Sequence, residues 1–139
     1  MDRRIARFIK KHHVLSLATS NENIPWTSHV FYAWLPEETA LVFTTDPETR
    51  HGREMRSHPV VSGGIVLETK VIGRIRGIQL AGMVETVGND PGKYRSAYIK
   101  RFPFALAAKL DLWVLRIDHV KMTDNRLGFG KKLTWNREG

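Results

Sequence analysis

Four side chains that lie close together in the chain could bind an anion. Thr44 and Thr45 bring two hydroxyls to the end of an apolar, β-branched run that predicts a strand. Asp46 predicts the N-cap of a short helix, and Arg50 and His51 follow within its first turns. Unpaired N–H groups at a helix N-terminus favour phosphate, especially beside a guanidinium group. From this segment alone, a phosphate site and a solvent-exposed basic helix are equally good interpretations.

The same helix carries two further arginines, Arg53 and Arg56, at spacings of three. Pro59 predicts that the helix ends near His58, because the residue before a proline disfavours helical backbone angles. Arg53 and Arg56 lie away from the helix N-terminus, so we expect them on the solvent-exposed surface rather than at the anion.

Motifs for protein-based covalent catalysis or metal binding are missing from the sequence. It has no cysteine, which excludes disulfides, thiolate metal sites and cysteine nucleophiles. Its six histidines show no metal-ligand spacing, so we assign no metal. The P-loop, G-x-G-x-x-G, H-E-x-x-H and G-x-S-x-G motifs do not occur. If the protein is an enzyme, we expect a bound cofactor to carry the reaction.

Length and composition predict one globular domain over residues 1–139. The chain is 42% hydrophobic and 26% charged, which is ordinary for a folded domain. Its formal net charge of +8 favours an anionic partner, either a small molecule or, more weakly, nucleic acid. Neither a signal peptide nor an apolar run of the ~20 residues that span a bilayer is recognisable. We therefore expect a soluble cytoplasmic protein.

The apolar pattern predicts a mainly β (α+β) domain whose first three strands form an antiparallel meander. The absence of a βαβ rhythm argues against a parallel sheet, and closure into a small barrel would remove exposed edges. We predict an antiparallel β-barrel of about six to seven strands with flanking short helices. The expected strands are 14–19, 25–34, 40–45, 60–67, 74–87, 112–123 and 131–135, and the expected helices are 1–12, 47–58, 91–101 and 104–110, with a turn at 89–92.

Four glycines interrupt the expected strands. Gly63 and Gly64 indicate a bulge, a bend, or the close approach of another backbone or ligand. Gly77 and Gly82 would let the longest strand bend sharply, as barrel strands do.

Four aromatic residues crowd the second expected strand: Trp26, Phe31, Tyr32 and Trp34. A place in the core or in a dimer interface is favoured for them over stacking on a ligand, because large aromatic side chains concentrate at cores and interfaces. A single-strand nucleic-acid binder would also combine aromatic and basic residues, but no RNP-like motif is present.

A longer pattern resembles a known superfamily. The segment Val-Phe-Thr-Thr-Asp-Pro-Glu-Thr-Arg-His at 42–51, closed by Ser-His-Pro-Val-Val at 57–61, resembles a strand, phosphate-binding turn and helix of known proteins. These elements belong to the FMN-binding split barrel of the pyridoxamine 5'-phosphate oxidase-like superfamily. The YhbP-like group of small bacterial proteins is matched by Arg-Gly-Ile-Gln-Leu-Ala-Gly at 76–82, Arg-Phe-Pro at 101–103, and the segment 123–132 with Trp135. The resemblance covers nearly the whole chain and implies an antiparallel split β-barrel.

The resemblance also implies a homodimer with two FMN molecules in grooves between the subunits. Thr44 and Thr45 would contact the phosphate and ribityl region, and Arg50 would pair with the phosphate. His51 stands where the superfamily usually has lysine. A neutral imidazole offers one donor instead of a fixed charge, which would make phosphate binding weaker or pH-dependent.

The second strand would supply further contacts to the flavin. His29 falls where pyridoxamine phosphate oxidases carry arginine, and Trp34 falls where they carry lysine. Val30 and Phe31 would lie along the flavin ring through their backbone.

Two later positions complete the implied site. Gly77 falls where the oxidases have a flavin-contacting glutamine, and Gln79, on the same strand face, can serve instead. Lys131 is expected to reach the flavin from the partner subunit. A counterpart of the arginine-containing substrate motif near the oxidases' C-terminus is missing, which argues against a strict pyridoxamine phosphate oxidase.

These residues lead to three hypotheses. The first is an FMN-dependent oxidoreductase of unknown substrate, in which the cofactor carries the hydride chemistry. The second keeps the split barrel but gives it another ligand, a deazaflavin or haem. The third is a basic, non-enzymatic module that binds nucleic acid.

Overall fold

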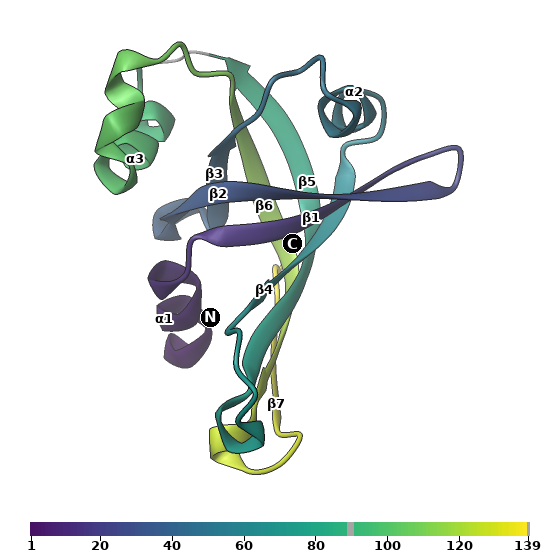
Figure 1. Ribbon diagram of the computed structural model, residues 1–139, viewed down its shortest axis with the longest axis vertical. Coiled ribbons are helices and arrows are strands. Elements are labelled where there is room, and N and C mark those ends of the chain that lie inside the picture. Colours follow the sequence, from purple (N-terminus) through teal and green to yellow (C-terminus); the bar gives the residue numbers. More distant parts are fainter. Residues whose placement is uncertain (89–90, 139) are drawn as a thin grey trace.

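One antiparallel sheet organises the molecule (Figure 1). The computed structural model describes residues 1–88 and 91–138. Within them the strand order is β3-β2-β1-β4-β5-β6-β7, and a further pairing of β3 with β6 closes the sheet into a barrel. The strands are β1 Val14–Asn21, β2 Ile24–Leu35, β3 Ala40–Thr44, β4 Val60–Val66, β5 Arg76–Gly88, β6 Leu112–Asp124 and β7 Lys132–Asn136.

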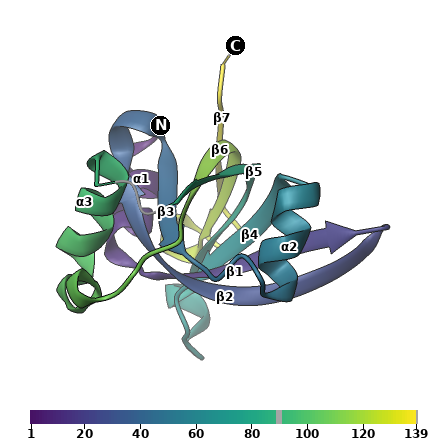
Figure 2. The same cartoon turned by 90° about the horizontal axis from the view of Figure 1, so that it is seen from above.

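Three α-helices flank the barrel in the described part of the chain. They are α1 Arg3–Lys11, α2 Arg50–Ser57 and α3 Lys93–Arg101. Seen from above, α2 and α3 lie on opposite sides of the barrel, and the long β1–β2 hairpin extends past α2 (Figure 2). The mainly β prediction and the antiparallel meander of the first three strands are confirmed.

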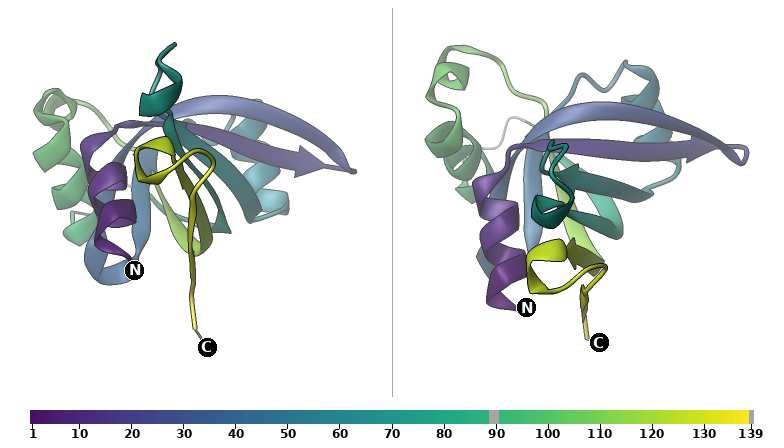
Figure 3. Two further views of the ribbon diagram at one scale, coloured as in Figure 1. Left: turned by 90° about the horizontal axis from the view of Figure 1, so that it is seen from below. Right: turned by 60° about the horizontal axis from the view of Figure 1, so that its bottom comes forward.

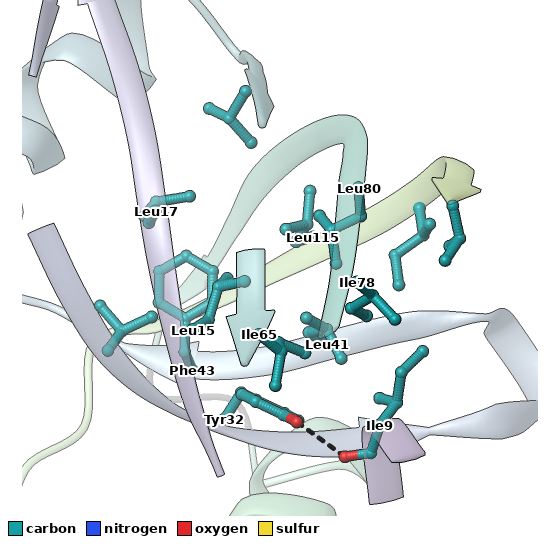
Figure 4. Close-up of a cluster of buried hydrophobic side chains, with 14 of the residues drawn as sticks. Ile9, Leu15, Leu17, Tyr32, Leu41, Phe43, Ile65, Ile78, Leu80 and Leu115 are labelled. Carbon is teal, nitrogen blue, oxygen red and sulfur yellow. Dashed lines mark hydrogen bonds between the residues drawn. The ribbon is translucent and has the colours of Figure 1, made fainter. Parts of the chain in front are cut away.

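The larger hydrophobic core fills the barrel and is covered at one end by α1 (Figure 4). Ile5, Phe8 and Ile9 form the apolar face of that helix and are almost completely buried. The hydroxyl of Tyr32 donates a 2.7 Å hydrogen bond to the carbonyl oxygen of Ile9, which satisfies a buried polar group on each side. The sheet and α1 therefore share one core.

A second core lies on the outer face of the sheet, beneath α3. Alternate residues of β6 serve the two cores: Leu112 and Val114 face α3, whereas Trp113 and Leu115 face the barrel interior. Helix α3 covers the outer face only near β3 and β6. Among the described residues, no helix covers the outer face of β1, β4 and β5.

The strand glycines are explained by close backbone approaches. A Cβ at Gly63 would lie 2.8 Å from both the Leu15 side chain and the Ser16 carbonyl oxygen. At Gly82, where the β5–β6 register shifts, it would lie 2.1 Å from the Arg116 carbonyl oxygen. The close-approach interpretation is correct for Gly63, and Gly82, where a sharp bend was predicted, lies at a register shift and a close backbone approach.

Some predicted boundaries were wrong. The expected helix at 104–110 is a five-residue 3-10 helix, Pro103–Ala107, which ends where Ala108 adopts extended backbone angles. The strand expected from residue 74 begins at Arg76, since Ile72–Arg74 form another 3-10 turn. Residues 89 and 90 of the expected turn at 89–92 lie outside the described residues.

Candidate functional site

Helix α2 begins at Arg50, three residues later than predicted. Thr49 is its N-cap, because the Thr49 hydroxyl accepts a 3.1 Å hydrogen bond from the N–H of Gly52. The Asp46 carboxylate is already used by the N–H of Glu48, at 2.8 Å, which forms a separate turn before the helix. The N-cap prediction at Asp46 was therefore wrong, whereas the predicted end near His58 is confirmed.

The loop before α2 packs directly onto the helix. A Cβ at residue 52 would lie 2.6 Å from the carbonyl oxygen of Asp46, so only glycine allows this approach. Arg53 donates to the carbonyl oxygen of Glu48 at 3.0 Å, and Arg56 donates to that of Pro47 at 3.3 Å. Both arginines are exposed, as predicted, but they also hold the loop that shapes the start of the helix.

The two threonines at the end of β3 have different partners. The Thr44 hydroxyl donates to the carbonyl oxygen of Asp111 at 3.2 Å, so its proton is directed into the protein. The Thr45 hydroxyl lies 2.5 Å from Nε2 of His51. Partial burial lowers the pKa of His51, which favours a neutral imidazole at neutral pH. The structure thus joins Thr45 to His51 and turns Thr44 away from them.

Arg50 is held by a network that spans α2, β1 and β2. Its Nε donates to the carboxylate of Glu54 at 3.1 Å, and its guanidinium lies 4.1 Å from the ring centroid of Trp26. Glu54 is only 8% exposed and also accepts a 2.7 Å hydrogen bond from the hydroxyl of Thr19. That bond, with the one from Arg50, lowers the pKa of Glu54 and keeps it charged.

This network leaves anion-binding groups available. Both Nη groups of Arg50 lack a hydrogen-bond partner among the described residues, and so do the backbone N–H groups of Arg50 and His51. These donors belong to the first turn of α2, where the helix dipole favours negative charge. Chemically, the arrangement can bind a phosphate group.

Sequence reasoning missed Thr19, Trp26 and Glu54 as parts of this site. The spacing of Arg50 and Glu54, one helical turn apart, was the available signal for their ion pair. The contributions of Thr19 and Trp26 depend on the hairpin lying across α2, which no local pattern predicts.

A second group of predicted residues lies on the outer face of the sheet. Strand pairing aligns His29, Ser16, Gly64, Gln79 and Lys121 in one row across β2, β1, β4, β5 and β6. Nδ1 of His29 lies 3.1 Å from the Ser16 hydroxyl. A surface pocket of about 400 Å³ includes Ser16, Gly64, Gln79 and Lys121 in its lining. His29 and Gln79 are therefore brought to the same face, and Lys121 is a cation there that the sequence reasoning missed.

The remaining predicted residues are more scattered. The Val30 side chain is buried in the barrel core. Phe31 is 51% exposed on the outer face, with its ring between those of His13 and Phe102 at centroid distances of 5.9 and 5.7 Å. Lys131 is exposed in the turn that precedes β7, outside the row that contains Gln79.

The predicted aromatic residues of β2 divide between core and surface. Tyr32 is buried and Trp34 packs against the barrel core, whereas Trp26 and Phe31 remain 43% and 51% exposed. Among the described residues, no group of three or more His, Cys, Asp or Glu could hold a metal ion. No helix in that part of the chain is long and apolar enough to cross a membrane.

Known sequences match this chain over nearly its full length. A family sequence model described as pyridoxamine 5'-phosphate oxidase matches residues 1–124. The UPF0306 protein plu4501 of Photorhabdus laumondii is 40% identical over 134 residues, which are 96% of this chain and 94% of that protein. The UPF0306 protein YhbP of Salmonella schwarzengrund is 36% identical over 135 residues, 96% of this chain and 92% of that protein.

Solved structures share the fold. A heme binding protein from Mycobacterium smegmatis has a TM-score of 0.74 at 26% identity over 94% of this chain, which spans 56% of the length of that protein. A protein from Mesorhizobium loti described as FAD-binding has a TM-score of 0.70 at 14% identity, with 88% of this chain and 94% of the other covered. The split-barrel prediction and the YhbP-like resemblance are confirmed.

Proposed function

The chain belongs to the pyridoxamine 5'-phosphate oxidase family, and we propose that it binds FMN with the phosphate at the first turn of α2. The observation that supports this proposal is the fixed orientation of the Arg50 guanidinium. Glu54 and Trp26 fix its guanidinium, yet within residues 1–88 and 91–138 neither its Nη groups nor the backbone N–H groups of Arg50 and His51 have a hydrogen-bond partner. A preoriented arginine loses less side-chain entropy when it binds phosphate.

We further propose that the protein is an FMN-dependent oxidoreductase. The bound flavin would supply the hydride or electron transfer, and the chain would bind and orient it. Arg50 and the helix N-terminus would hold the phosphate, with Thr45 and His51 beside it. His29 and Gln79 offer polar groups on a sheet face whose small residues, Ser16 and Gly64, leave room for a flat ring.

A homodimer is part of this proposal. The outer face of β1 and β4 exposes small or aliphatic side chains and carries no charge: Val14, Ser16, Ala18, Val60, Ser62, Gly64 and Val66. An uncharged, apolar face of this kind is typical of a protein interface. A second copy packed on it would place groups such as Gln79 or Lys131 of one subunit beside a flavin held by the other.

Haem is a second candidate ligand because of His29. This histidine is exposed, and its Nδ1 forms a hydrogen bond with the Ser16 hydroxyl. Its Nε2 therefore remains available to bind an iron atom. The related heme binding protein from Mycobacterium smegmatis motivates the comparison.

Titration of the purified protein with FMN, followed by flavin fluorescence, tests the leading proposal. We expect Arg50→Gln to weaken binding about tenfold to a hundredfold, the range for a lost charge-assisted hydrogen bond. Arg74→Gln is the control, since Arg74 is exposed and lies outside α2 and the loop before it.

Equal affinities of wild type and Arg50→Gln would disprove the phosphate assignment, and a wild-type protein that binds no FMN would disprove the proposed function. A parallel haem titration, followed by the Soret band, separates the candidates. Loss of that band in His29→Ala with unchanged FMN binding would assign haem to the sheet face.

A further inference from the structure

A small pocket lined by five cationic side chains lies far from α2, beside α1. It is a cavity of about 190 Å³ between α1, the start of β5 and the end of β6. Figure 3 shows α1 next to the turn that follows β6, and Figure 1 shows α2 at the other side of the molecule. The cations are Arg4, Arg7, Lys11, Arg76 and Arg126.

Two of these charges are already neutralised. Arg4 pairs with Asp2 at 2.9 Å, and Arg126 pairs with the fully buried Asp124 at 2.8 Å. For Arg7, Lys11 and Arg76 the described part of the chain offers no ion pair. Five cations and two carboxylates leave an excess of three positive charges around a space smaller than a drug-sized ligand needs.

Arg76 adds a second observation. Its Nε is buried and has no hydrogen-bond partner among the described residues. A buried donor without a partner is costly and rare, and often marks the place of an ion or ligand. Arg76 lies directly opposite Asp124 in the β5–β6 register, yet the carboxylate of Asp124 is occupied by Arg126. Arg76, whose Nε lacks a partner among the described residues, is therefore also a lining residue of a pocket that carries excess positive charge.

The wall formed by α1 is fixed in position. Arg101 donates hydrogen bonds to three carbonyl oxygens at the C-terminal end of α1, those of Lys10, Lys11 and His12, at 3.0 to 3.2 Å. The opposite face of the helix is anchored by its buried apolar residues in the barrel core. The helix backbone that carries Arg4, Arg7 and Lys11 is thus fixed against the strand ends before any ligand arrives, which favours binding.

We propose that this pocket binds a phosphate group, carried by inorganic phosphate or by a phosphomonoester. A dianion matches the excess of positive charge, and guanidinium groups bind phosphate through paired hydrogen bonds. A neighbouring hollow of about 570 Å³ shares Arg4 and Arg7 with the pocket and would accommodate the organic part of a phosphomonoester. The site is independent of the proposed flavin phosphate site, because the two share no residue.

Isothermal titration of the purified protein with inorganic phosphate at constant ionic strength tests the proposal. We expect Arg76→Met to weaken phosphate binding about tenfold or more, because it removes the donor and the charge together. Arg7→Gln is a second variant at an exposed helix position, where folding is not at stake. Arg74→Met is the matched control, since Arg74 is exposed two residues away and does not line the pocket.

Glycerol 3-phosphate, titrated in the same way, distinguishes a site for a phosphomonoester from a site for inorganic phosphate. Tighter binding than inorganic phosphate would assign a phosphomonoester, whereas weaker binding would assign the free ion. Phosphate binding that survives both Arg76→Met and Arg7→Gln, or that disappears in Arg50→Gln, would overturn the proposal. Arg7 lines this pocket and not the sheet-face pocket proposed for the flavin ring, so FMN binding that is unchanged in Arg7→Gln keeps the two sites experimentally separate.

Discussion

At the scale of single residues, His51 sets the charge of the proposed flavin phosphate site. Its ring lies 2.5 Å from the Thr45 hydroxyl, and partial burial lowers its pKa, so it is neutral at neutral pH. Lysine at this position would keep a positive charge. We expect His51→Lys to bind FMN about tenfold more tightly at about pH 8, from one additional charge-assisted hydrogen bond.

The pH dependence of this difference identifies its cause. The pKa of His51 is depressed, so the imidazole gains its charge only as the pH falls below the ordinary value of about 6.5. The ratio of the two affinities should therefore shrink between about pH 8 and about pH 5.5, and because both proteins bind the same FMN, titration of the phosphate cancels. Ser57→Lys, at the far end of α2, controls for added charge. A ratio that stays constant over this range would refute the role of His51.

The structure brings predicted site residues together where they are close in sequence, while their role in binding FMN stays a prediction. Thr45, Arg50 and His51 lie within seven residues, so a strand followed by a helix had to bring them together. The partners that orient Arg50 come from the β1–β2 hairpin, and their positions depend on long-range strand pairing. The N-cap was misassigned because Asp46 and Thr49 are both good caps, and only the turn made by Asp46 decides between them.

At the scale of secondary-structure elements, strand periodicity predicted the sheet well because buried and exposed residues alternate along most strands. The pairing of β3 with β6, which closes the barrel, joins segments about seventy residues apart and leaves no local pattern. The two apolar faces of β6 indicate a strand that is buried on both sides. They do not indicate that α3 is the element that covers the outer face.

Glu38 joins α3 to the barrel and predicts an acid-dependent stability. Its carboxylate contacts Lys93 and Arg116 and accepts a 3.0 Å hydrogen bond from Tyr94. Lys93 and then Arg116 lower the pKa of Glu38 to about 2. Because the pKa is depressed in the folded state, the stabilisation is complete above the ordinary value and is lost as the pH falls from about 4.5 towards 2.

The variant Glu38→Gln should therefore be less stable than wild type at neutral pH, by about 1 kcal/mol because the partners are partly exposed and screened. The difference should disappear towards pH 2, where wild-type Glu38 becomes protonated. Urea unfolding at several pH values measures this. Glu37→Gln is the control, since no ion pair involves Glu37 within the described residues. Parallel stability curves for wild type and Glu38→Gln would contradict the prediction.

At the scale of the whole molecule, no helix among the described residues covers the outer face of β1, β4 and β5, and we propose that a second copy packs on it. Ser62 lies near its centre, paired with Ala18 on one side and Ala81 on the other. If two copies meet through this face, Ser62→Arg would bury a charge without a partner, which strongly opposes association. We expect light scattering after gel filtration to give twice the 15.9 kDa chain mass for wild type and the single mass for Ser62→Arg. Ser96→Arg, on the exposed side of α3, adds the same charge elsewhere and should remain dimeric. A wild-type protein with the mass of one chain would contradict the dimer, and it would require the flavin to be held by one subunit's groups alone.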